Sequence, residues 1–339
     1  MGTIKLGCVA GVVAMVWAGG CDEDGRVDDV GVFGADDEDD GVVQARTVVI
    51  NDLRLNDLRL NDLRLNGSVF NATDPNPGVR LNGDAPLTDW IEITDFWLPN
   101  GGSSLVGQLQ GGMLRIQTGG GWLEEWDVEN TIITYSVTEG GSTKTKEVWL
   151  KWASELGAYS GVWSYVADLR INGGPWQPLC LDAQGNRQDT LLLGDVWEPS
   201  SGNKLPRPAN IVTFACRSAA LAKCVEFGYK PWASKNGTPL ANYHQACTRM
   251  VRADYCGDGN SHTLSGTQIH VLDQLAIQKK AVGVTYAVEA EWGPNGATCL
   301  NPANRRHSEL PVVCEDGHSI PACGATAFSS GGLIQSGKL

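Results

Sequence analysis

Apolar and polar residues alternate through much of residues 88–205, which is the pattern of strands with one buried face. Turn signals separate the alternating runs: Gly111-Gly112, Glu139-Gly140-Gly141-Ser142 and Asn172-Gly173. The runs themselves are Ile133, Tyr135 and Val137; Val148, Leu150 and Trp152; and Trp163, Tyr165, Ala167, Leu169 and Ile171. We therefore predict an antiparallel β-rich region over residues 88–205, with a sandwich or barrel-like form.

The pattern changes over residues 206–325. Ile211–Cys216 reads as a strand, and a first helix is predicted from Ser218, as N-cap, to Phe227, with Gly228 ending it. A second helix is predicted from Thr238-Pro239 to Gly257. Its apolar stripe follows helical spacing: Leu240, Tyr243, His244, Cys247, Met250, Val251 and Asp254.

Further strands are predicted near Ile269–Leu272 and Val282–Trp292, and residues 326–339 are assigned to a C-terminal tail. The predicted fold class is therefore α+β. An N-terminal antiparallel β-rich region precedes a disulfide-stapled region with two short helices and additional strands.

The segments before residue 88 carry other signals. Lys5, an apolar run over residues 6–17 and Ala18-Gly19-Gly20-Cys21 are typical of an export signal over residues 1–21. Cys21 looks like the lipid-attachment site of a bacterial lipoprotein. Ordinary cleavage nearby and an uncleaved anchor are the alternatives. Residues 22–46 hold ten acidic residues against Arg26 and Arg46, so we expect a solvated tether.

Residues 47–87 contain a repeat of period five, Asn-Asp-Leu-Arg-Leu, which begins at Asn51, Asn56 and Asn61. It looks like a pentapeptide-repeat β-helix, but these few units make less than one coil. We expect a short edge structure that leans on another element, or a partly disordered duplication, followed by a loop.

The cysteines indicate the compartment. Apart from Cys8 in the leader and Cys21, eight remain: Cys180, Cys216, Cys224, Cys247, Cys256, Cys299, Cys314 and Cys323. An even set in an exported chain predicts disulfides. No Cys-x-x-Cys or His-Glu-x-x-His spacing occurs, so neither a metal site nor a cofactor is predicted. Because Cys224 and Cys247 lie on the apolar faces of the two predicted helices, we expect them to pair.

The second helix also carries a family resemblance. The run His244-Gln-Ala-Cys247-Thr-Arg-Met-Val-Arg-Ala-Asp-Tyr-Cys256-Gly-Asp-Gly259 resembles the signature of ADYC-domain proteins, named for Ala253–Cys256. Ala215–Ala220, Gly228–Trp232, Gly266-Thr267 and Glu291–Cys299 also fit, so the resemblance covers roughly residues 100–325. It implies an exported bacterial, largely myxobacterial, lipoprotein with no assigned reaction, and it transfers no catalytic residue.

Three side chains are candidates for chemistry. Asp254 lies near the predicted C-terminus of the second helix, where the macrodipole disfavours an anion, so it needs a partner such as Arg249, Arg252 or a buried N–H. An internal ion pair and a general acid or base are the two interpretations. Asp258 and His262 follow in a loop of ordinary turn chemistry, where oxygen ligands for calcium are the alternative. For His244 we expect a buried neutral imidazole rather than a base.

Charge narrows the function classes. The formal net charge is −13, and no basic patch suggests nucleic acid. The sequence thus predicts an exported protein, lipid-anchored in the bacterial cell envelope or at the surface. Its predicted role is structural or binding, with a protein or glycan ligand and an undetermined oligomeric state. The alternative is an exported hydrolase that uses Asp254, Asp258 and His262, which would require those groups to converge in an open pocket.

Overall fold

The computed structural model describes residues 47–50, 58–64 and 92–338, except 105, 140, 158–159, 182–184, 199–200, 206–210, 218, 265–266, 280–284, 286 and 310. The predicted leader, the lipid-attachment cysteine and the acidic tether lie outside these residues. All described residues belong to one unit, Val32–Leu339. Among them, no helix combines the length and apolar character needed to cross a membrane.

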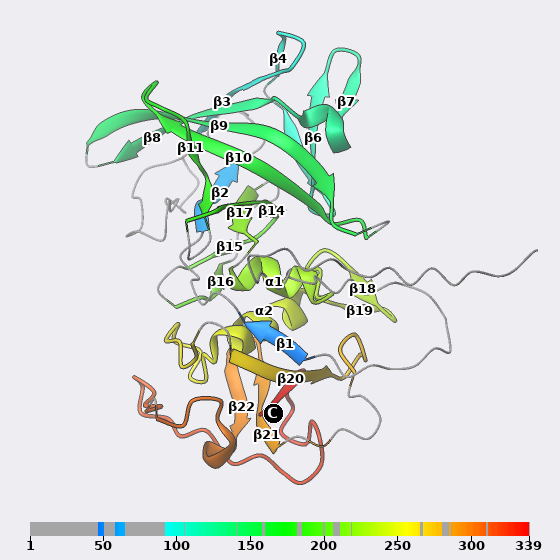
Figure 1. The fold of residues 1–339 in the computed structure, drawn as a ribbon, viewed down its shortest axis with the longest axis vertical. Helices are drawn as coiled ribbons and strands as arrows, with labels where there is room; N and C mark the ends of the chain where they lie inside the picture. Colours follow the sequence, from blue (N-terminus) through cyan, green and yellow to red (C-terminus); the bar gives the residue numbers. More distant parts are fainter. Residues whose placement is uncertain are drawn as a thin grey trace, which may run out of the picture. The chain divides into compact units, whose positions relative to one another are not determined.

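The largest sheet is antiparallel and joins nine of the described strands (Figure 1). Its order is β2 (Leu58–Arg64), β17 (Ile211–Cys216), β14 (Thr190–Leu193), β10 (Trp163–Ile171), β9 (Ser142–Glu155), β8 (Ile132–Glu139), β3 (Glu92–Trp97) and β4 (Ser103–Ser104), with β11 (Gln177–Pro178) paired to β10. The predicted strand runs around residues 133–137, 148–152 and 163–171 are confirmed as β8, β9 and β10.

A smaller antiparallel sheet packs on one face of this large sheet. It consists of β5 (Gly107–Gln110), β6 (Met113–Thr118) and β7 (Gly121–Leu123), and its first turn is the predicted Gly111-Gly112. Leu114 and Ile116 of β6 share one buried core with Phe96, Tyr135 and Val148 of the large sheet. The Tyr165 hydroxyl of β10 accepts a hydrogen bond from the Leu114 N–H at 2.8 Å. The two sheets therefore form a sandwich-like pair of layers.

The opposite face of the large sheet is divided between a helix and solvent. α1 (Ala220–Glu226) packs Leu221, Ala222 and Val225 over β14 and β17. The outer face of β3, β8, β9 and β10 carries several partly or fully exposed side chains, described below. One sheet thus has a core side and, over part of its area, an open side.

α2 (Ala241–Arg252) joins α1 to a second sheet. This sheet is antiparallel, in the order β1 (Thr47–Ile50), β20 (Thr267–Asp273), β23 (Ile334–Lys338), β21 (Ala287–Gly293) and β22 (Gly296–Leu300). Met250 and Val251 of α2 pack against Trp292, Ile269 and Ile334 of the sheet. Residues 334–338, which the sequence assigned to a tail, thus form the central strand.

Short elements complete the described chain. The paired strands are β12 (Cys180–Leu181) with β13 (Arg187–Gln188), β15 (Val196–Trp197) with β16 (Lys204–Leu205), and β18 (Ser234–Lys235) with β19 (Thr238–Pro239). Two 3-10 helices are η2 (Glu125–Val128) and η3 (Pro302–Asn304).

The predicted bounds of the second helix are wrong at both ends. Thr238-Pro239 belongs to β19, and the helix begins at Ala241. It ends at Arg252 because Ala253 adopts a left-handed conformation with φ of 50°. The residues of the predicted stripe are nevertheless buried, including Asp254, which follows the helix rather than lying on it.

Two predicted faces also need correction. Trp152 does not share the buried face of Val148 and Leu150, and the Trp152 side chain is 56% exposed. The reason is a β-bulge between Leu150 and Trp152, which reverses the alternation of side chains along β9. In β21 both faces are buried, so Glu289 and Glu291 are as inaccessible as Trp292. Residues 282–284 and 286 of that predicted strand lie outside the described residues.

The repeat contributes an edge strand. β2, drawn from the Asn-Asp-Leu-Arg-Leu units, pairs antiparallel with β17, with Leu60 opposite Phe214. This agrees with the expected edge structure that leans on another element, while the described part of the repeat is a single strand.

The eight cysteines form four disulfides, as the even count predicted. The pairs are Cys180–Cys216, Cys224–Cys247, Cys256–Cys314 and Cys299–Cys323. The predicted link between the two helices, Cys224–Cys247, is confirmed. One pair thus links α1 to α2, one links β12 to β17, and two tie down the segment after β21.

Candidate functional site

The sequence candidates lie where α2 ends. The left-handed conformation of Ala253 turns the chain, and the Asp254 N–H donates to the carbonyl of Arg249 at 2.9 Å. This turn carries the Asp254 carboxylate back toward the helix that it follows. Asp254 is fully buried.

Two arginines and one backbone N–H hold Asp254. Arg249 Nη1 donates to Asp254 Oδ2 at 2.5 Å, Gly259 N–H donates to the same oxygen at 3.1 Å, and Arg252 Nη1 lies 3.8 Å away. Burial raises the pKa of Asp254, and Arg249 and Arg252 oppose that rise. The internal ion pair expected from the sequence is therefore confirmed.

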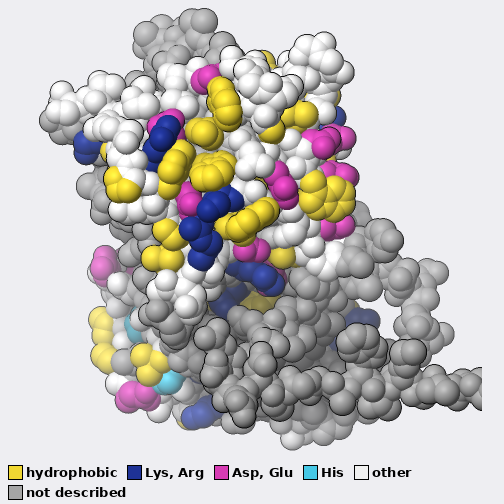
Figure 2. Space-filling view, turned by 45° about the horizontal axis from the view of Figure 1, so that its top comes forward, with side chains coloured by type: hydrophobic (Ala, Val, Ile, Leu, Met, Phe, Trp, Pro, Cys, Tyr) yellow, Lys and Arg dark blue, Asp and Glu magenta, His cyan; other side chains and the backbone are white. Residues whose placement is uncertain are grey.

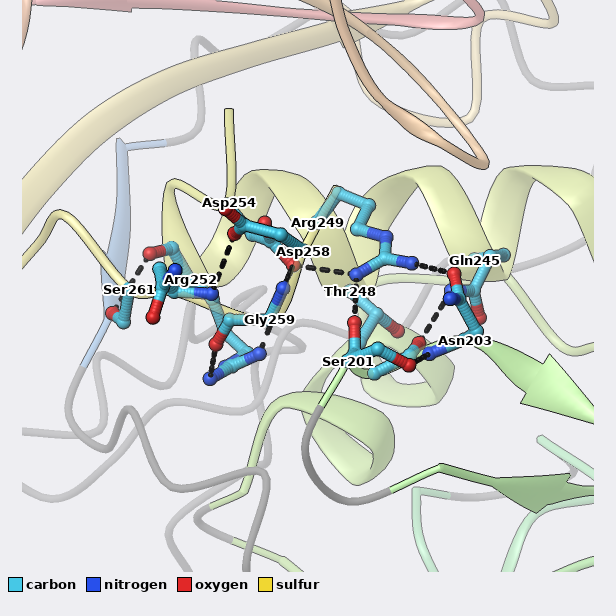
Figure 3. Close-up of polar contacts among 12 residues, drawn as sticks. Ser201, Asn203, Gln245, Thr248, Arg249, Arg252, Asp254, Asp258, Gly259 and Ser261 are labelled. Atoms are coloured by element: carbon cyan, nitrogen blue, oxygen red, sulfur yellow. Dashed lines mark hydrogen bonds and ion pairs between the residues drawn. The ribbon is translucent and has the colours of Figure 1, made fainter. Parts of the chain in front are cut away.

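Arg249 also connects other segments (Figure 3). It donates from Nη1 to the Ser201 carbonyl at 2.6 Å, from Nη2 to Asn203 Oδ1 at 2.5 Å, and from Nε to the Pro294 carbonyl at 3.1 Å. One buried guanidinium thus ties the β15–β16 hairpin, the loop after α2 and the β21–β22 turn together.

The other two hydrolase candidates have local partners. Asp258 Oδ1 accepts from the Asn260 N–H at 2.9 Å, which is turn chemistry. His262, 9% exposed, has Nδ1 3.1 Å from the Ala253 carbonyl, so that nitrogen donates. Among these described residues no hydrogen bond joins Asp254, Asp258 and His262 to one another, although all three lie within one short loop.

His244 behaves as the sequence indicated. Its Nε2 donates to the Leu221 carbonyl at 2.9 Å, and burial lowers its pKa to about 4. The imidazole is therefore neutral at physiological pH and serves to join α2 to α1. Within the described residues, no group of three or more His, Cys, Asp and Glu is arranged to hold a metal ion.

The sequence analysis missed a buried carboxylate network in the second sheet. Glu289 is paired with Arg306, whose Nε and Nη2 lie 2.9 and 2.6 Å from its two carboxylate oxygens. It also accepts from the hydroxyls of Tyr255 and Ser336, both at 2.7 Å. Burial alone would raise the pKa of Glu289, but the Arg306 charge and these hydrogen bonds lower it to about 2.

Glu291 lies in the same strand, two residues further on. Its oxygens accept from the Phe328 N–H at 2.5 Å and the Ser330 N–H at 3.1 Å. Both glutamates are therefore committed to holding the segments after β22. The available sequence signal was the presence of two acids in a strand whose other residues include Val288, Ala290 and Trp292.

A different kind of site lies on the outer face of the large sheet. We call it the tryptophan face and define it as Trp97, Trp149, Trp152 and Trp176. Trp97 and Trp152 are 47% and 56% exposed, and Trp149 and Trp176 are half-buried, with ring centroids 5.6 Å apart. Figure 2 shows hydrophobic side chains gathered around Lys and Arg side chains over the β-rich part of the chain.

Charged side chains lie among these rings. Lys151 Nζ is 5.0 Å from the Trp149 ring centroid and 5.5 Å from that of Trp152, and the Arg170 guanidinium lies 4.4 Å from Trp176. These distances are within the range of cation–π attraction. They favour the observed orientations of Trp149, Trp152 and Trp176 on a sheet whose other face is a packed core.

The cations of the tryptophan face are themselves paired. Lys151 and Arg187 both contact Asp168, which is buried between them. Arg170 makes a two-point contact with Glu147 at 2.5 and 2.7 Å. The face therefore presents apolar ring surface and polar groups with little net charge.

The comparisons with known proteins give one match. The model of the ADYC domain matches residues 114–306, more than half of the chain, from β6 in the sandwich to Arg306 in the buried network. No curated protein matches the chain. No solved structure matches it either. The match includes both helices, the Ala253–Cys256 turn and most of the tryptophan face, and the chain therefore belongs to the ADYC domain family.

Proposed function

We propose that this protein is exported, is lipid-anchored to a bacterial cell envelope through Cys21, and acts there as a binding protein whose contact surface is the tryptophan face. The tryptophan face carries the proposal. Two indoles about half exposed on a rigid sheet are large apolar surfaces that folding leaves open. Tryptophan is also the residue type most enriched where binding energy concentrates.

The cellular location rests on the sequence and is compatible with the disulfides. Four disulfides form readily in an oxidising compartment and seldom in a reducing one. The leader and the position of Cys21 support export and lipid attachment. A lipid plus an acidic spacer would hold the folded part at a distance from the membrane surface.

The contacts of the hydrolase candidates favour a structural role for them. Asp254 is paired with Arg249, and His262 donates from Nδ1 to Ala253. These contacts, with the bond that Asp258 accepts from the Asn260 N–H, give the three side chains a role in closing the loop after α2.

Fractionation tests the anchor. In the producing bacterium, the full-length protein should sediment with membranes, and Cys21→Ser should move it to the soluble fraction. Cys8→Ser is the matched control, because Cys8 lies inside the leader and should leave the membrane association unchanged. A Cys21→Ser protein that stays with the membranes contradicts lipid attachment at this residue.

Co-sedimentation tests the binding role. The unacylated Cys21→Ser protein should sediment with envelopes of the producing cells from which lipid has been extracted. Trp152→Ala should weaken this binding. Trp126→Ala is the control, since Trp126 is also 56% exposed but packs in η2 against Trp163 of the core side. Equal binding by the two variants would refute the tryptophan face as the contact surface.

A further inference from the structure

We infer that the ligand of the tryptophan face is an uncharged polysaccharide of β-linked pyranose units, which lies across the strands of the large sheet. This inference rests on the proposed binding function and specifies its ligand. It follows from the order of side chains across the sheet, the chemistry of the rings and the balance of charge.

The strand register sets the side chains in rows. Trp97 pairs with Ile132, Ile132 with Trp149, and Trp149 with Asp168. Residues paired in this way lie on the same face of a sheet, so the row crosses four strands on the outer face. Trp97 and Trp149 are two strands apart, which corresponds to about 10 Å, roughly the length of two pyranose rings in an extended chain.

The ring faces suit sugar rings. The π-face of an indole is electron-rich and attracts the partly positive C–H groups of a neighbouring molecule. A pyranose whose hydroxyls are equatorial presents several such C–H groups on a flat face. Rings held on a β-sheet at fixed spacing can therefore contact successive sugars of one chain, and preorganisation lowers the cost of binding.

Hydrogen-bonding groups lie beside this row. The neighbouring row on the same face is Asp95, Thr134, Glu147 and Arg170, again defined by direct pairing between strands. Sugar hydroxyls both donate and accept, so paired carboxylate and guanidinium groups can bind them without a net charge on the ligand.

Charge selects against an anionic polymer. Each cation of the face lies against a carboxylate: Lys151 and Arg187 against Asp168, and Arg170 against Glu147. An anionic chain would have to compete with these acids and would meet Asp95 as well. A neutral chain has no such cost.

The same pairs make a protein partner the weaker fit. The centres of protein–protein interfaces are depleted of charged residues. Here a cluster of one lysine, one arginine and one aspartate lies at the end of the tryptophan row. Rings interspersed with paired charges resemble a series of sugar subsites more than a continuous apolar core.

The test uses the full-length protein in mild detergent and two uncharged probes, chitohexaose and cellohexaose, with polygalacturonate as the anionic probe. Calorimetry and tryptophan fluorescence should detect binding of at least one uncharged probe, with little change in affinity between low and high salt. Trp97→Ala and Trp152→Ala should each weaken it by about tenfold, as expected for a residue that contributes strongly to binding. Trp152→Tyr should retain part of the affinity, and Trp126→Ala should leave it within about twofold.

Three results would overturn the inference. They are no binding of either uncharged probe, binding that Trp126→Ala weakens as much as Trp152→Ala, or a preference for polygalacturonate that salt abolishes. These results leave the proposed function separately testable. If Trp152→Ala still weakens binding to delipidated envelopes, and protease treatment of those envelopes removes the binding, then the partner is a protein and only the glycan inference fails.

Discussion

The Glu289–Arg306 pair gives the sharpest test of how the second sheet is held together. Glu289 is completely buried at the middle of the sheet and accepts hydrogen bonds from Arg306, Tyr255 and Ser336. Glu289→Gln keeps the size of the side chain, removes its charge and replaces one acceptor oxygen with an amide NH2 that donates. The change therefore removes the ion pair with Arg306 and one of the two acceptor oxygens together.

The magnitude follows from the pKa of Glu289. Its pKa is about 2 in the folded protein against 4.5 for the ordinary group. The ionised carboxylate then stabilises the fold by about 3 kcal/mol at neutral pH. The pKa of Arg306 is raised by the same partner, which agrees in direction. Since a depressed acid pKa favours the folded state above the unfolded pKa, this contribution is present at pH 7 and is lost as the pH falls from about 4.5 to about 2.

The assay is urea unfolding followed by tryptophan fluorescence, with the disulfides intact, at pH values from 7 to 2. Glu289→Gln should lose about 3–5 kcal/mol of unfolding free energy at pH 7, since it leaves the Arg306 charge buried without its partner. The loss should shrink toward pH 2, where the wild-type carboxylate is also neutral. Glu309→Gln is the control, because Glu309 pairs with His307 at an exposed position and its removal should have no measurable effect. A loss below about 1 kcal/mol at pH 7, or one of equal size at pH 7 and pH 2, would refute the reasoning.

Three further changes test other parts of the fold. Replacing Cys224 and Cys247 together by alanine should lower the unfolding free energy by about 3 kcal/mol, measured by urea unfolding, because their bridge closes a 23-residue separation; an unchanged urea midpoint would contradict this. Asp254→Asn should lower the melting temperature with a loss of about 1–3 kcal/mol. This loss is smaller than the loss expected for Glu289→Gln, because burial raises the pKa of Asp254 whereas the pKa of Glu289 is lowered. A larger loss for Asp254→Asn would contradict that ranking. Gly257→Ala should be severely destabilising by thermal unfolding, since φ is +72° and an added Cβ would lie 1.9 Å from the Asn295 carbonyl oxygen. The control Gly237→Ala, with φ of +78° and open space, should lose only about 1 kcal/mol, and similar losses at both positions would argue against the close contact.

Local patterns in the sequence predicted the local structure well. Two-residue periodicity located β8, β9 and β10, and helical periodicity identified the buried stripe of α2 and paired Cys224 with Cys247. The other three disulfides could not be paired in this way. Cys256 and Cys314, for example, meet because a loop after α2 and a segment after η3 cover the same sheet, and 58 residues separate them.

The end of α2 shows what local patterns leave out. The apolar stripe continues at Asp254, so periodicity extends the helix past Ala253. The structure ends it there with a left-handed alanine, a conformation that costs an L-residue about 1 kcal/mol. The contacts that offset this cost are distant in sequence: Asn203 and Pro294 bind Arg249, which holds Asp254. Only the folded chain brings these partners together.

The tryptophan face escaped prediction for a related reason. Alternation placed Trp152 on the buried face because Trp152 follows Val148 and Leu150 at even spacing. Trp149 lies between two of these positions, so the same pattern did not select it. The bulge between the pairs of Leu150 and Trp152 shifts the alternation by one residue, so Trp152 joins Trp149 on the outer face. A bulge that increases the twist and re-aims a side chain is a recurrent device next to functional sites. Here its effect is to place two indoles and one lysine on the same open surface, the surface to which we assign the proposed binding.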